Sequence, residues 1–151
     1  MESEVYLECW TDGSTIKQKG QGRGDCGIAF AVTDGSDILF CGGEFIGKQT
    51  SNYAEMYAIL RCLEEVAERI EGDILGLTVY SDSKVSIEGL AGRFEIRSEN
   101  LVPLVKRIEG LYMRLPAEPE YEWVRGHSGE PLNEFVDLLA YTCSTGHPYD
   151  E

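Results

Sequence analysis

The sequence predicts an α/β fold with a mixed five-stranded sheet flanked by helices. Three observations predict it. The first three strand-like apolar runs follow one another without a helix, which indicates an antiparallel meander. The rest of the chain alternates strand-like runs with segments whose apolar residues recur every 3.6 positions. The resulting order is β-β-β-α-β-α-α-β-α, and a strand that follows a crossover helix is expected to pair parallel to an earlier strand.

The first part of the chain is expected to form the meander. Its three strands are predicted at residues 4–11, 26–33 and 38–46. A glycine-rich connection at residues 20–24 separates the first two, and Asp34-Gly35-Ser36-Asp37 between the second and third is a hairpin signal. Gly42-Gly43 inside the third strand indicates a bulge or a close backbone approach.

The second part is expected to supply the helices and the remaining strands. Helices are predicted at residues 52–70, 83–91, 98–114 and 131–143, and strands at residues 74–80 and 121–125. Asn52, followed by Glu55 three residues later, is a capping-box pattern for the first helix. Pro116 ends the third helix, and Pro131 starts the last one.

Length and composition indicate one ordinary globular domain. We place it at residues 1–144 of the 151, with 145–151 as a flexible tail. The chain is 42% hydrophobic, no stretch approaches the roughly 18 apolar residues of a membrane helix, and the acidic first four residues are unlike a signal peptide. Its five cysteines form no C-x-x-C pair. We therefore expect a monomeric cytoplasmic protein with reduced thiols and no zinc site.

The charge balance is strongly acidic, with 27 acids against 13 bases and a net charge of −14. Proteins that bind nucleic acids usually carry a basic face, so this balance argues against a general affinity for polyanions. Bound divalent ions would neutralise part of the charge. The bases also cluster locally, in the loop of Lys17, Lys19 and Arg23 and again at Arg93 and Arg97.

Four carboxylates stand at the ends or on the inner faces of the predicted elements. Asp12 ends the first strand, Glu55 opens the first long helix, Asp82 follows the strand at 74–80, and Asp137 lies in the last helix. In open α/β sheets, functional residues gather beyond the strand ends where the strand order switches. Four converging carboxylates would make an oxygen-only site for hard divalent cations, which suits phosphoryl-transfer chemistry.

Each of these acids also has a structural interpretation. Asp12 precedes Gly13-Ser14 and is typical of a turn, Glu55 fits a capping position, and Asp82 fits the N-cap of the following helix. Asp137 borders an apolar helix face, and His127 lies in a glycine-flanked loop, so both also fit surface positions. For most of them the structural reading is favoured in isolation. Their order and spacing together favour a common site.

The motifs that contain these acids resemble ribonuclease H, type I. The segments that carry the resemblance are YLECWTDGS at 6–14, TSNYAE at 50–55, VYSDS at 79–83, WVRGHSG at 123–129 and NEFVD at 133–137. The resemblance runs from about residue 4 to residue 143. It implies a ribonuclease H-like fold and an endonuclease that cleaves the RNA strand of RNA/DNA hybrids, leaving 3′-hydroxyl and 5′-phosphate ends.

The resemblance also implies two Mg²⁺ ions, with Mn²⁺ as a substitute, about 3.5–4 Å apart at the scissile phosphate. Carried over by position, Asp12 would bridge both ions, Glu55 and Asp82 would bind the leaving-group ion, and Asp137 would bind the nucleophile-side ion. His127 matches a mobile histidine that assists proton transfer or product departure, a role suited to a side chain that titrates near neutral pH. Glu134 is a further acid, for which a solvent-facing position is favoured.

Hybrid recognition is expected through the minor groove, where 2′-hydroxyls distinguish RNA from DNA. The candidate substrate contacts are Asn52, which matches a groove-contacting residue of the family, with Ser14, Ser51, Ser83 and Lys84. Many bacterial members carry a basic protrusion before the third helix. Here that interval, residues 89–100, is short and nearly charge-balanced. We therefore expect weak hybrid binding that falls steeply with salt, with Lys84, Arg93 and Arg97 as the remaining phosphate contacts.

Three alternatives remain open at this point. The first is a ribonuclease H-like module that binds without cleaving, although none of the metal-binding acids is missing. The second is another nuclease of the same superfamily, against which Asp12-Gly13-Ser14 and the Gly126–Gly129 loop argue. The third is a small α/β regulatory domain whose acids lie in turns.

Overall fold

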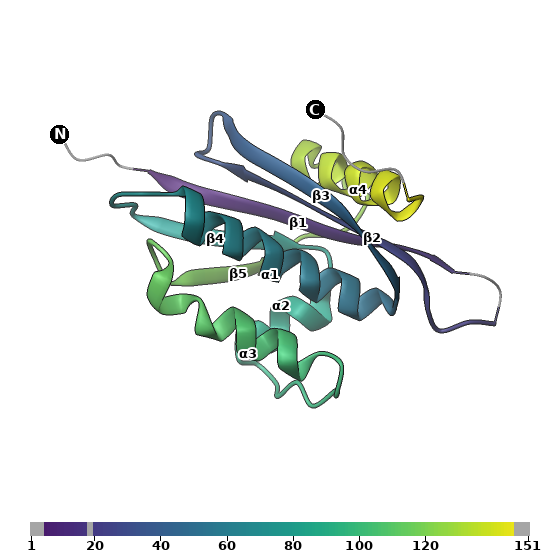
Figure 1. The fold of residues 1–151 in the computed structure, drawn as a ribbon. Helices are drawn as coiled ribbons and strands as arrows, with labels where there is room; N and C mark the ends of the chain where they lie inside the picture. Colours follow the sequence, from purple (N-terminus) through teal and green to yellow (C-terminus); the bar gives the residue numbers. More distant parts are fainter. Residues whose placement is uncertain (1–4, 18–19, 147–151) are drawn as a thin grey trace.

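A computed structural model describes residues 5–17 and 20–146 (Figure 1). The strands are β1 (Tyr6–Lys17), β2 (Gly24–Thr33), β3 (Ile38–Gln49), β4 (Gly76–Ser81) and β5 (Pro119–Trp123). The helices are α1 (Ser51–Arg69), α2 (Lys84–Leu90), α3 (Val102–Gly110) and α4 (Pro131–Ser144), with a 3₁₀ turn η1 at Tyr112–Arg114. The predicted order of strands and helices is confirmed.

The five strands form one mixed sheet in the order β3-β2-β1-β4-β5. β1 pairs antiparallel with β2, and β2 with β3, so the meander is confirmed. β4 pairs parallel with β1, and β5 parallel with β4. After three strands that run outward, α1 carries the chain back across β1 to β4. The strand order therefore switches between β1 and β4, where a site is expected in an open α/β sheet.

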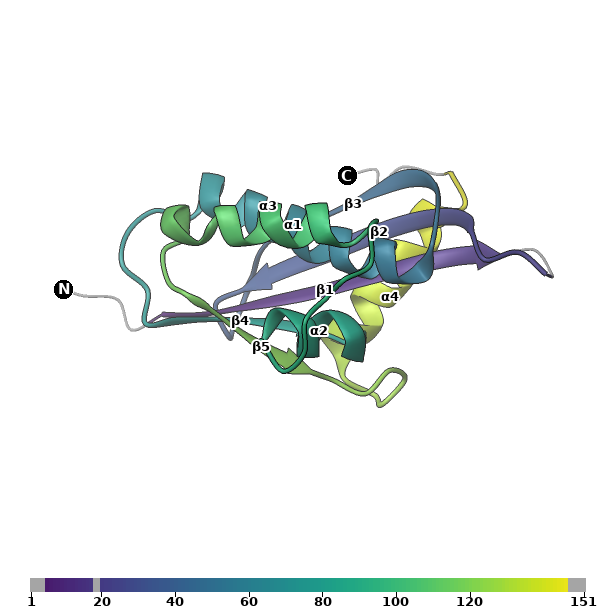
Figure 2. The same cartoon turned by 90° about the horizontal axis from the view of Figure 1, so that it is seen from below.

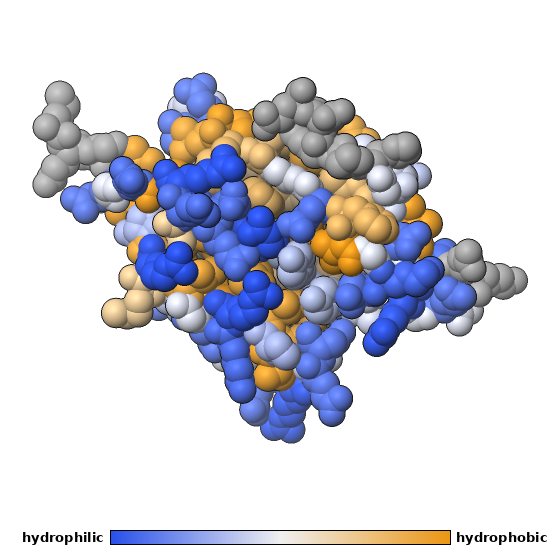
Figure 3. Space-filling view, in the orientation of Figure 1, coloured by the Kyte–Doolittle hydropathy of each residue, from blue (hydrophilic) through white to orange (hydrophobic). Residues whose placement is uncertain are grey.

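The sheet separates two layers of helices. Figure 2 shows α1 and α3 on one side of the sheet and α4 on the other. Because side chains alternate along a strand, Leu7 and Cys9 of β1 pack in the cluster under α1, whereas Trp10 packs with Val136 and Ala140 of α4. Hydrophilic residues dominate the face that carries α1 and α3 (Figure 3). No helix among the described residues is long and apolar enough to cross a membrane.

The N-cap of helix α1 lies two residues before the one that the capping-box pattern predicted. Its N-cap is Thr50, whose hydroxyl accepts a hydrogen bond from the Tyr53 amide at 3.2 Å. Asn52 is the second residue of the helix and is not the cap, so that prediction was wrong. Glu55 therefore has no capping role, and its carboxylate is available for other contacts.

Two other predicted bounds were wrong. β1 continues to Lys17, paired with Gly24 of β2, so the glycine-rich connection is the tip of a long hairpin and Asp12 lies inside the strand rather than at its end. The helix expected at 98–114 begins only at Val102, because residues 98–101 form a turn in which the Leu101 amide donates to the Ser98 carbonyl. The predictions for residues 1–4 and for the tail from 147 onward concern residues outside the described ranges, as does the one for Lys19.

Other local predictions were confirmed. The Asp34 carboxylate accepts from the amides of Ser36 and Asp37 in the β2–β3 hairpin. Gly43 is a place of close approach, since a Cβ there would lie 2.8 Å from the Cys143 sulfur. The bulge reading of the same residues was wrong, because the register shifts of β2 and β3 lie at Cys26/Gly27 and Val32/Thr33.

Gly27 in β2 sets how closely α4 approaches the sheet. A Cβ at this position would lie 2.3 Å from the Ala140 carbonyl oxygen and 2.3 Å from the Ser144 amide nitrogen. Both are backbone atoms of α4, which cannot move aside without shifting the helix. This close contact holds α4, and Asp137 with it, against β1 and β2.

We predict that Gly27→Ala destabilises the fold by about 2 kcal/mol or more, because the added methyl group forces α4 away from the sheet. Urea unfolding followed by circular dichroism measures the change. Gly22→Ala is the matched control, since a Cβ there meets nothing within 4 Å, and it is expected to change stability by less than about 0.5 kcal/mol. Equal losses in the two variants would contradict the role of Gly27.

Candidate active site

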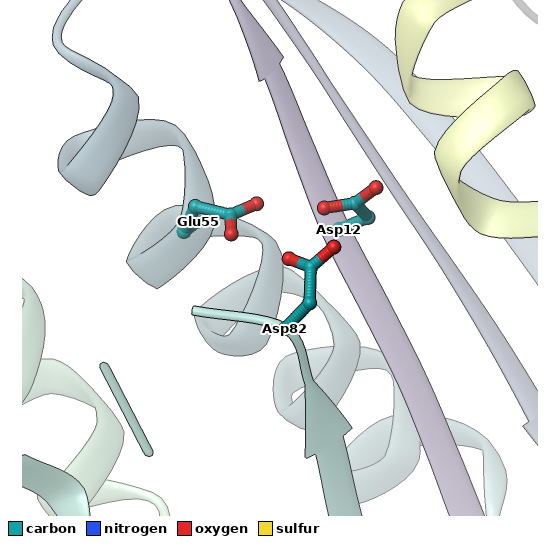
Figure 4. A group of neighbouring side chains, drawn as sticks. All are labelled: Asp12, Glu55 and Asp82. Carbon is teal, nitrogen blue, oxygen red and sulfur yellow. The ribbon is translucent and has the colours of Figure 1, made fainter. Parts of the chain in front are cut away.

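Three carboxylates from three elements point toward one another at the switch in strand order. Asp12 lies in β1, Glu55 in the second turn of α1, and Asp82 directly after β4 (Figure 4). Each offers one carboxylate oxygen, and these oxygens all lie within 4.8 Å of one another. The sequence predicted that these acids would meet although they are far apart along the chain, and the structure brings the three together.

Gly13 brings Asp12 and Glu55 together. A Cβ on Gly13 would lie 2.6 Å from the Ala54 carbonyl carbon and 2.7 Å from the Glu55 amide nitrogen. Only a glycine therefore allows the start of α1 to lie so close to β1. The Gly13 amide donates to Glu55 Oε1 at 2.5 Å and lies 2.9 Å from Asp12 Oδ1. One backbone amide thus links the two carboxylates.

Asp82 lies in a short link between β4 and α2. The N-cap of α2 is Ser83, whose hydroxyl accepts from the Ser86 amide, so the N-cap reading of Asp82 is wrong. The Ser83 amide donates to Ser81 Oγ at 3.0 Å, which tightens the link. On the other side, a Cβ on Gly126 would lie 3.0 Å from Asp82 Oδ2. The loop after β5 therefore packs directly against this carboxylate.

Asp137 approaches the cluster from the opposite face of the sheet. It is half-buried on α4 and is not one of the three carboxylates that share the 4.8 Å group. Its carboxylate is nevertheless close enough to Asp12 that its charge raises the pKa of Asp12. The fourth predicted acid therefore lies next to the group of three, on the Asp12 side.

Burial and mutual repulsion raise the pKa of Asp12 and of Glu55. Burial raises the pKa of Asp12 to about 8, the hydrogen bond with Glu55 opposes this rise, and the charges of Asp82 and Asp137 add to it. Burial also raises the pKa of Glu55 well above its ordinary value, with Asp12 as the next largest cause. Near neutral pH the cluster without cations therefore retains protons, which a bound cation would release.

The donor set fits a hard divalent cation. Asp12 is only 3% exposed, and its Oδ2 is buried without a hydrogen-bond partner among the described residues. An unsatisfied buried acceptor is costly, and a cation at this position would satisfy it. Carboxylate oxygens are the ligands that Mg²⁺ and Mn²⁺ prefer. The residues present therefore suit the metal that the sequence motifs implied.

His127 lies at the edge of the site rather than inside it. It is exposed in the loop after β5, and it is the one non-glycine residue with positive φ (55°) among the described residues. Such a backbone is uncommon outside glycine. Its chain neighbour Gly126 packs against Asp82, so His127 is one residue along the chain from a contact with the cluster. Glu134 is exposed in the first turn of α4, in agreement with the solvent-facing reading.

The predicted substrate-binding residues differ in accessibility. Asn52 and Lys84 are exposed, and Ser14 and Ser51 are half-buried. Ser83 is buried, and its hydroxyl is engaged by the Ser86 amide and hydroxyl. Ser83 is therefore poorly placed to contact a substrate. The other four residues have surface available to a ligand, and their contact with the substrate stays a prediction.

The three bases predicted to contact phosphates differ in whether a carboxylate already pairs with their charge. Arg93 Nη1 lies 2.6 Å from Glu88 Oε2, and Arg97 Nη2 lies 3.2 Å from Glu95 Oε2. Lys84 instead places its ammonium 5.5 Å from the centre of the Trp123 ring. Among these three bases, Lys84 is the one whose charge no neighbouring carboxylate pairs with in the described residues.

Two residues at the site were not singled out from the sequence, Gly13 and Trp123. A glycine directly after a candidate acid would have indicated a close backbone approach. Trp123 gave no comparable signal, because its contact with the residue after β4 depends on the register of β4 and β5.

Comparison with known proteins gives consistent matches. Residues 4–144 match the family model described as RNase H. The chain is 30% identical to the ribonuclease H of Treponema denticola, over 90% of this chain and 95% of that protein. It is 31% identical to the ribonuclease H of Nitratidesulfovibrio vulgaris, over 95% of this chain and 94% of that protein.

Solved structures share the fold at lower identity. The N-terminal RNase H domain of a Mycobacterium tuberculosis protein superimposes with a TM-score of 0.78 at 24% identity, covering 95% of this chain and 96% of that one. RNase H1 of the halophilic archaeon Halobacterium salinarum gives 0.76 at 23%, with 93% and 98% covered. LC11-RNase H1, solved in complex with an RNA/DNA hybrid, gives 0.72 at 20%, with 90% and 97% covered.

We predict that Asp12→Asn stabilises the protein in the absence of divalent ions. Because the pKa of Asp12 is higher in the folded state (about 8) than its ordinary value of 3.8, its contribution to stability is lost as pH rises through that range. At about pH 8 the variant should melt at least about 3 °C higher, which corresponds to roughly 1 kcal/mol. The gap should narrow toward pH 5, and excess Mg²⁺ should raise the melting temperature of the wild type only.

Asp34→Asn is the control for this prediction. Hydrogen bonds from the Asp37 and Ser36 amides lower the pKa of Asp34, the opposite direction. Its charged form stabilises the fold above its ordinary pKa and loses that effect as pH falls. Asp34→Asn should therefore lower the melting temperature at neutral pH. An Asp12→Asn variant that melts below the wild type at pH 8 without metal would contradict the prediction.

Proposed function

Because the chain belongs to the RNase H family, a family of RNA-cleaving nucleases, we propose that it cleaves the RNA strand of RNA/DNA hybrids by metal-dependent hydrolysis. The products would be 3′-hydroxyl and 5′-phosphate ends. The observation that carries the proposal is the group of three converging carboxylates with the unsatisfied buried oxygen of Asp12. That hybrids are the substrate is further supported by the hybrid bound to LC11-RNase H1.

The acids would divide the work by their positions. Two Mg²⁺ ions, or Mn²⁺ in their place, would supply the chemistry by activating the attacking water and stabilising the leaving oxygen. Asp12 belongs to the group with Glu55 and Asp82, and the charge of Asp137 also acts on it, which supports its assignment as the bridging ligand. Glu55 and Asp82 would then hold the leaving-group side, and Asp137 the nucleophile side.

His127 would assist proton transfer or product departure from the edge of the site. Its exposure allows the ring to reach a bound phosphate or to release it to solvent. The contact between Gly126 and Asp82 places the start of its loop at the cluster. A residue in such a position would accelerate the reaction without being indispensable.

The remaining parts of the proposal concern recognition and context. Asn52, Ser14 and Ser51 would contact the minor groove, and Lys84 would contact a phosphate. We also propose that the protein acts as a monomer in the cytoplasm.

We predict that Asp12→Asn abolishes cleavage of a labelled hybrid in Mg²⁺ or Mn²⁺, because it removes the ligand shared by the two ions. His127→Ala should retain measurable cleavage, with kcat reduced by about 100-fold, the lower range for a lost proton-transfer group. Glu134→Gln, an exposed acid on the same helix as Asp137, should cleave almost normally.

Equal losses for Asp12→Asn and His127→Ala would contradict the assigned roles. Cleavage of the DNA strand, or of double-stranded RNA as fast as of hybrid, would contradict the proposed substrate. Absence of cleavage in both metals with retained hybrid binding would favour a module that binds without catalysis.

We predict that Lys84→Gln raises KM for the hybrid and lowers the slope of log KM against log salt by about 1, because one phosphate contact is lost. Arg93→Gln should change both much less, since Arg93 is already paired with Glu88. Steady-state assays between about 50 and 200 mM salt measure both quantities. Over this range of salt, an acidic enzyme of this kind should lose activity steeply. Equal effects of the two substitutions would contradict the special role of Lys84.

A further inference from the structure

A side-chain hydrogen bond ties the backbone of Asp82 to β5 just beyond the end of the β4–β5 ladder. The last paired residues of the two strands are Ser81 and Trp123. The Val124 amide still donates to the Ser81 carbonyl at 3.0 Å, which is the last backbone bond between these segments in the described chain. The next carbonyl, that of Asp82, instead accepts from the indole Nε1 of Trp123 at 3.1 Å. A side chain thus supplies the donor that the strand no longer provides.

Packing in the core does not account for Trp123. It is 43% exposed and belongs to none of the hydrophobic clusters of the described residues. The other tryptophan, Trp10, is 6% exposed, packs against α4, and stacks on Tyr80. A large aromatic side chain left half in solvent at this position has the indole hydrogen bond and the Lys84 cation–π contact as its two specific interactions.

We propose that Trp123 is a positioning residue for the carboxylate of Asp82, which rests on the proposed metal-dependent function of the cluster. Asp82 lies outside both β4 and α2, so the regular hydrogen bonds of neither element fix its peptide. The Ser83 amide is held by Ser81 Oγ, and the Asp82 carbonyl is held by Trp123. These two bonds restrain the backbone dihedrals that aim the carboxylate at Asp12 and Glu55 (Figure 4).

Losing the hydrogen bond between Trp123 and Asp82 should weaken metal binding more than substrate binding. A carboxylate displaced by about 1 Å loses a large part of its effect in a preorganised site. Groups that orient metal ligands without touching the metal typically contribute 10–100-fold to metal affinity or activity. Trp123 also supports Lys84 through its ring face, and this contact should influence substrate binding instead. The two interactions of the indole are therefore separable.

Trp123→Phe separates them, because it keeps an aromatic ring for Lys84 and removes only the N–H donor. We expect the Mg²⁺ dissociation constant, measured by calorimetry without substrate, to rise about 10-fold, with kcat at subsaturating Mg²⁺ falling similarly. KM for the hybrid, measured at saturating Mg²⁺, should stay within about twofold. Lys84→Gln is the matched control, since it removes the cation and keeps the indole bond, and it should leave the Mg²⁺ dissociation constant unchanged.

A second measurement tests the inference in the wild type, with the Trp123 hydrogen bond intact. The chain has two tryptophans, so ¹⁵N-labelled protein gives two indole N–H signals. Trp10 bonds to Glu8, on the same strand as Asp12 but outside the acid group, and its signal serves as an internal reference. Addition of Mg²⁺ should shift the Trp123 signal and slow its hydrogen exchange while the Trp10 signal changes little. This readout remains informative if Trp123→Phe folds poorly.

The outcomes distinguish this inference from the proposed function. If the wild type binds Mg²⁺ and Trp123→Phe binds it equally well, with no selective change of the Trp123 signal, the positioning role is overturned and the proposed function stands. If the wild type does not bind Mg²⁺, the proposed metal-dependent function is contradicted, and the positioning role that rests on it is contradicted with it. If Mg²⁺ binds and responds to Trp123→Phe but hybrid is not cleaved, the positioning role stands and the proposed substrate is wrong.

Discussion

The close contact of Gly13 with the first turns of α1 is the constraint on which the site depends. It lets the helix lie against the middle of β1, so that Glu55 faces Asp12 instead of solvent. The same amide then bonds to the carboxylate of Glu55. A side chain on residue 13 would push the helix away by the width of a methyl group, and the carboxylates would separate. Packing of backbone on backbone therefore fixes the geometry of the acids.

This arrangement of the acids lowers the stability of the metal-free protein. Burial disfavours the charged forms of Asp12 and Glu55, and the charges of the neighbouring acids disfavour them further. The fold must overcome that cost with the apolar core around α1 and with the tight contact of α4 at Gly27. A cation reverses the balance, because it favours the charged carboxylates. The groups that destabilise the empty site are thus the ones that bind metal.

Most of the fold followed from periodicity, and the acids followed from motifs that span several elements. The order of strands and helices and the mixed sheet were predicted from residue patterns, because each element buries a face of the expected period. The extent of β1 and the cap of α1 were not, since both depend on partners distant in sequence. Asp12 lies within a strand only because residues 24–29 pair alongside it. Trp123 was missed for the same reason, as its role exists only in the register of β4 and β5.

The acidity of the chain bears on how an anionic substrate is held. Arg61 bonds to Glu44 and Glu64, and Arg107 contacts Glu64, so these bases are engaged in ion pairs across α1, β3 and α3. Arg93 and Arg97 are likewise paired near the site. The long-range field of the protein therefore repels nucleic acid, and attraction must be local. Lys84 on the Trp123 ring and cations within the carboxylate cluster would provide it together, which makes metal binding a condition for substrate binding as well as for chemistry.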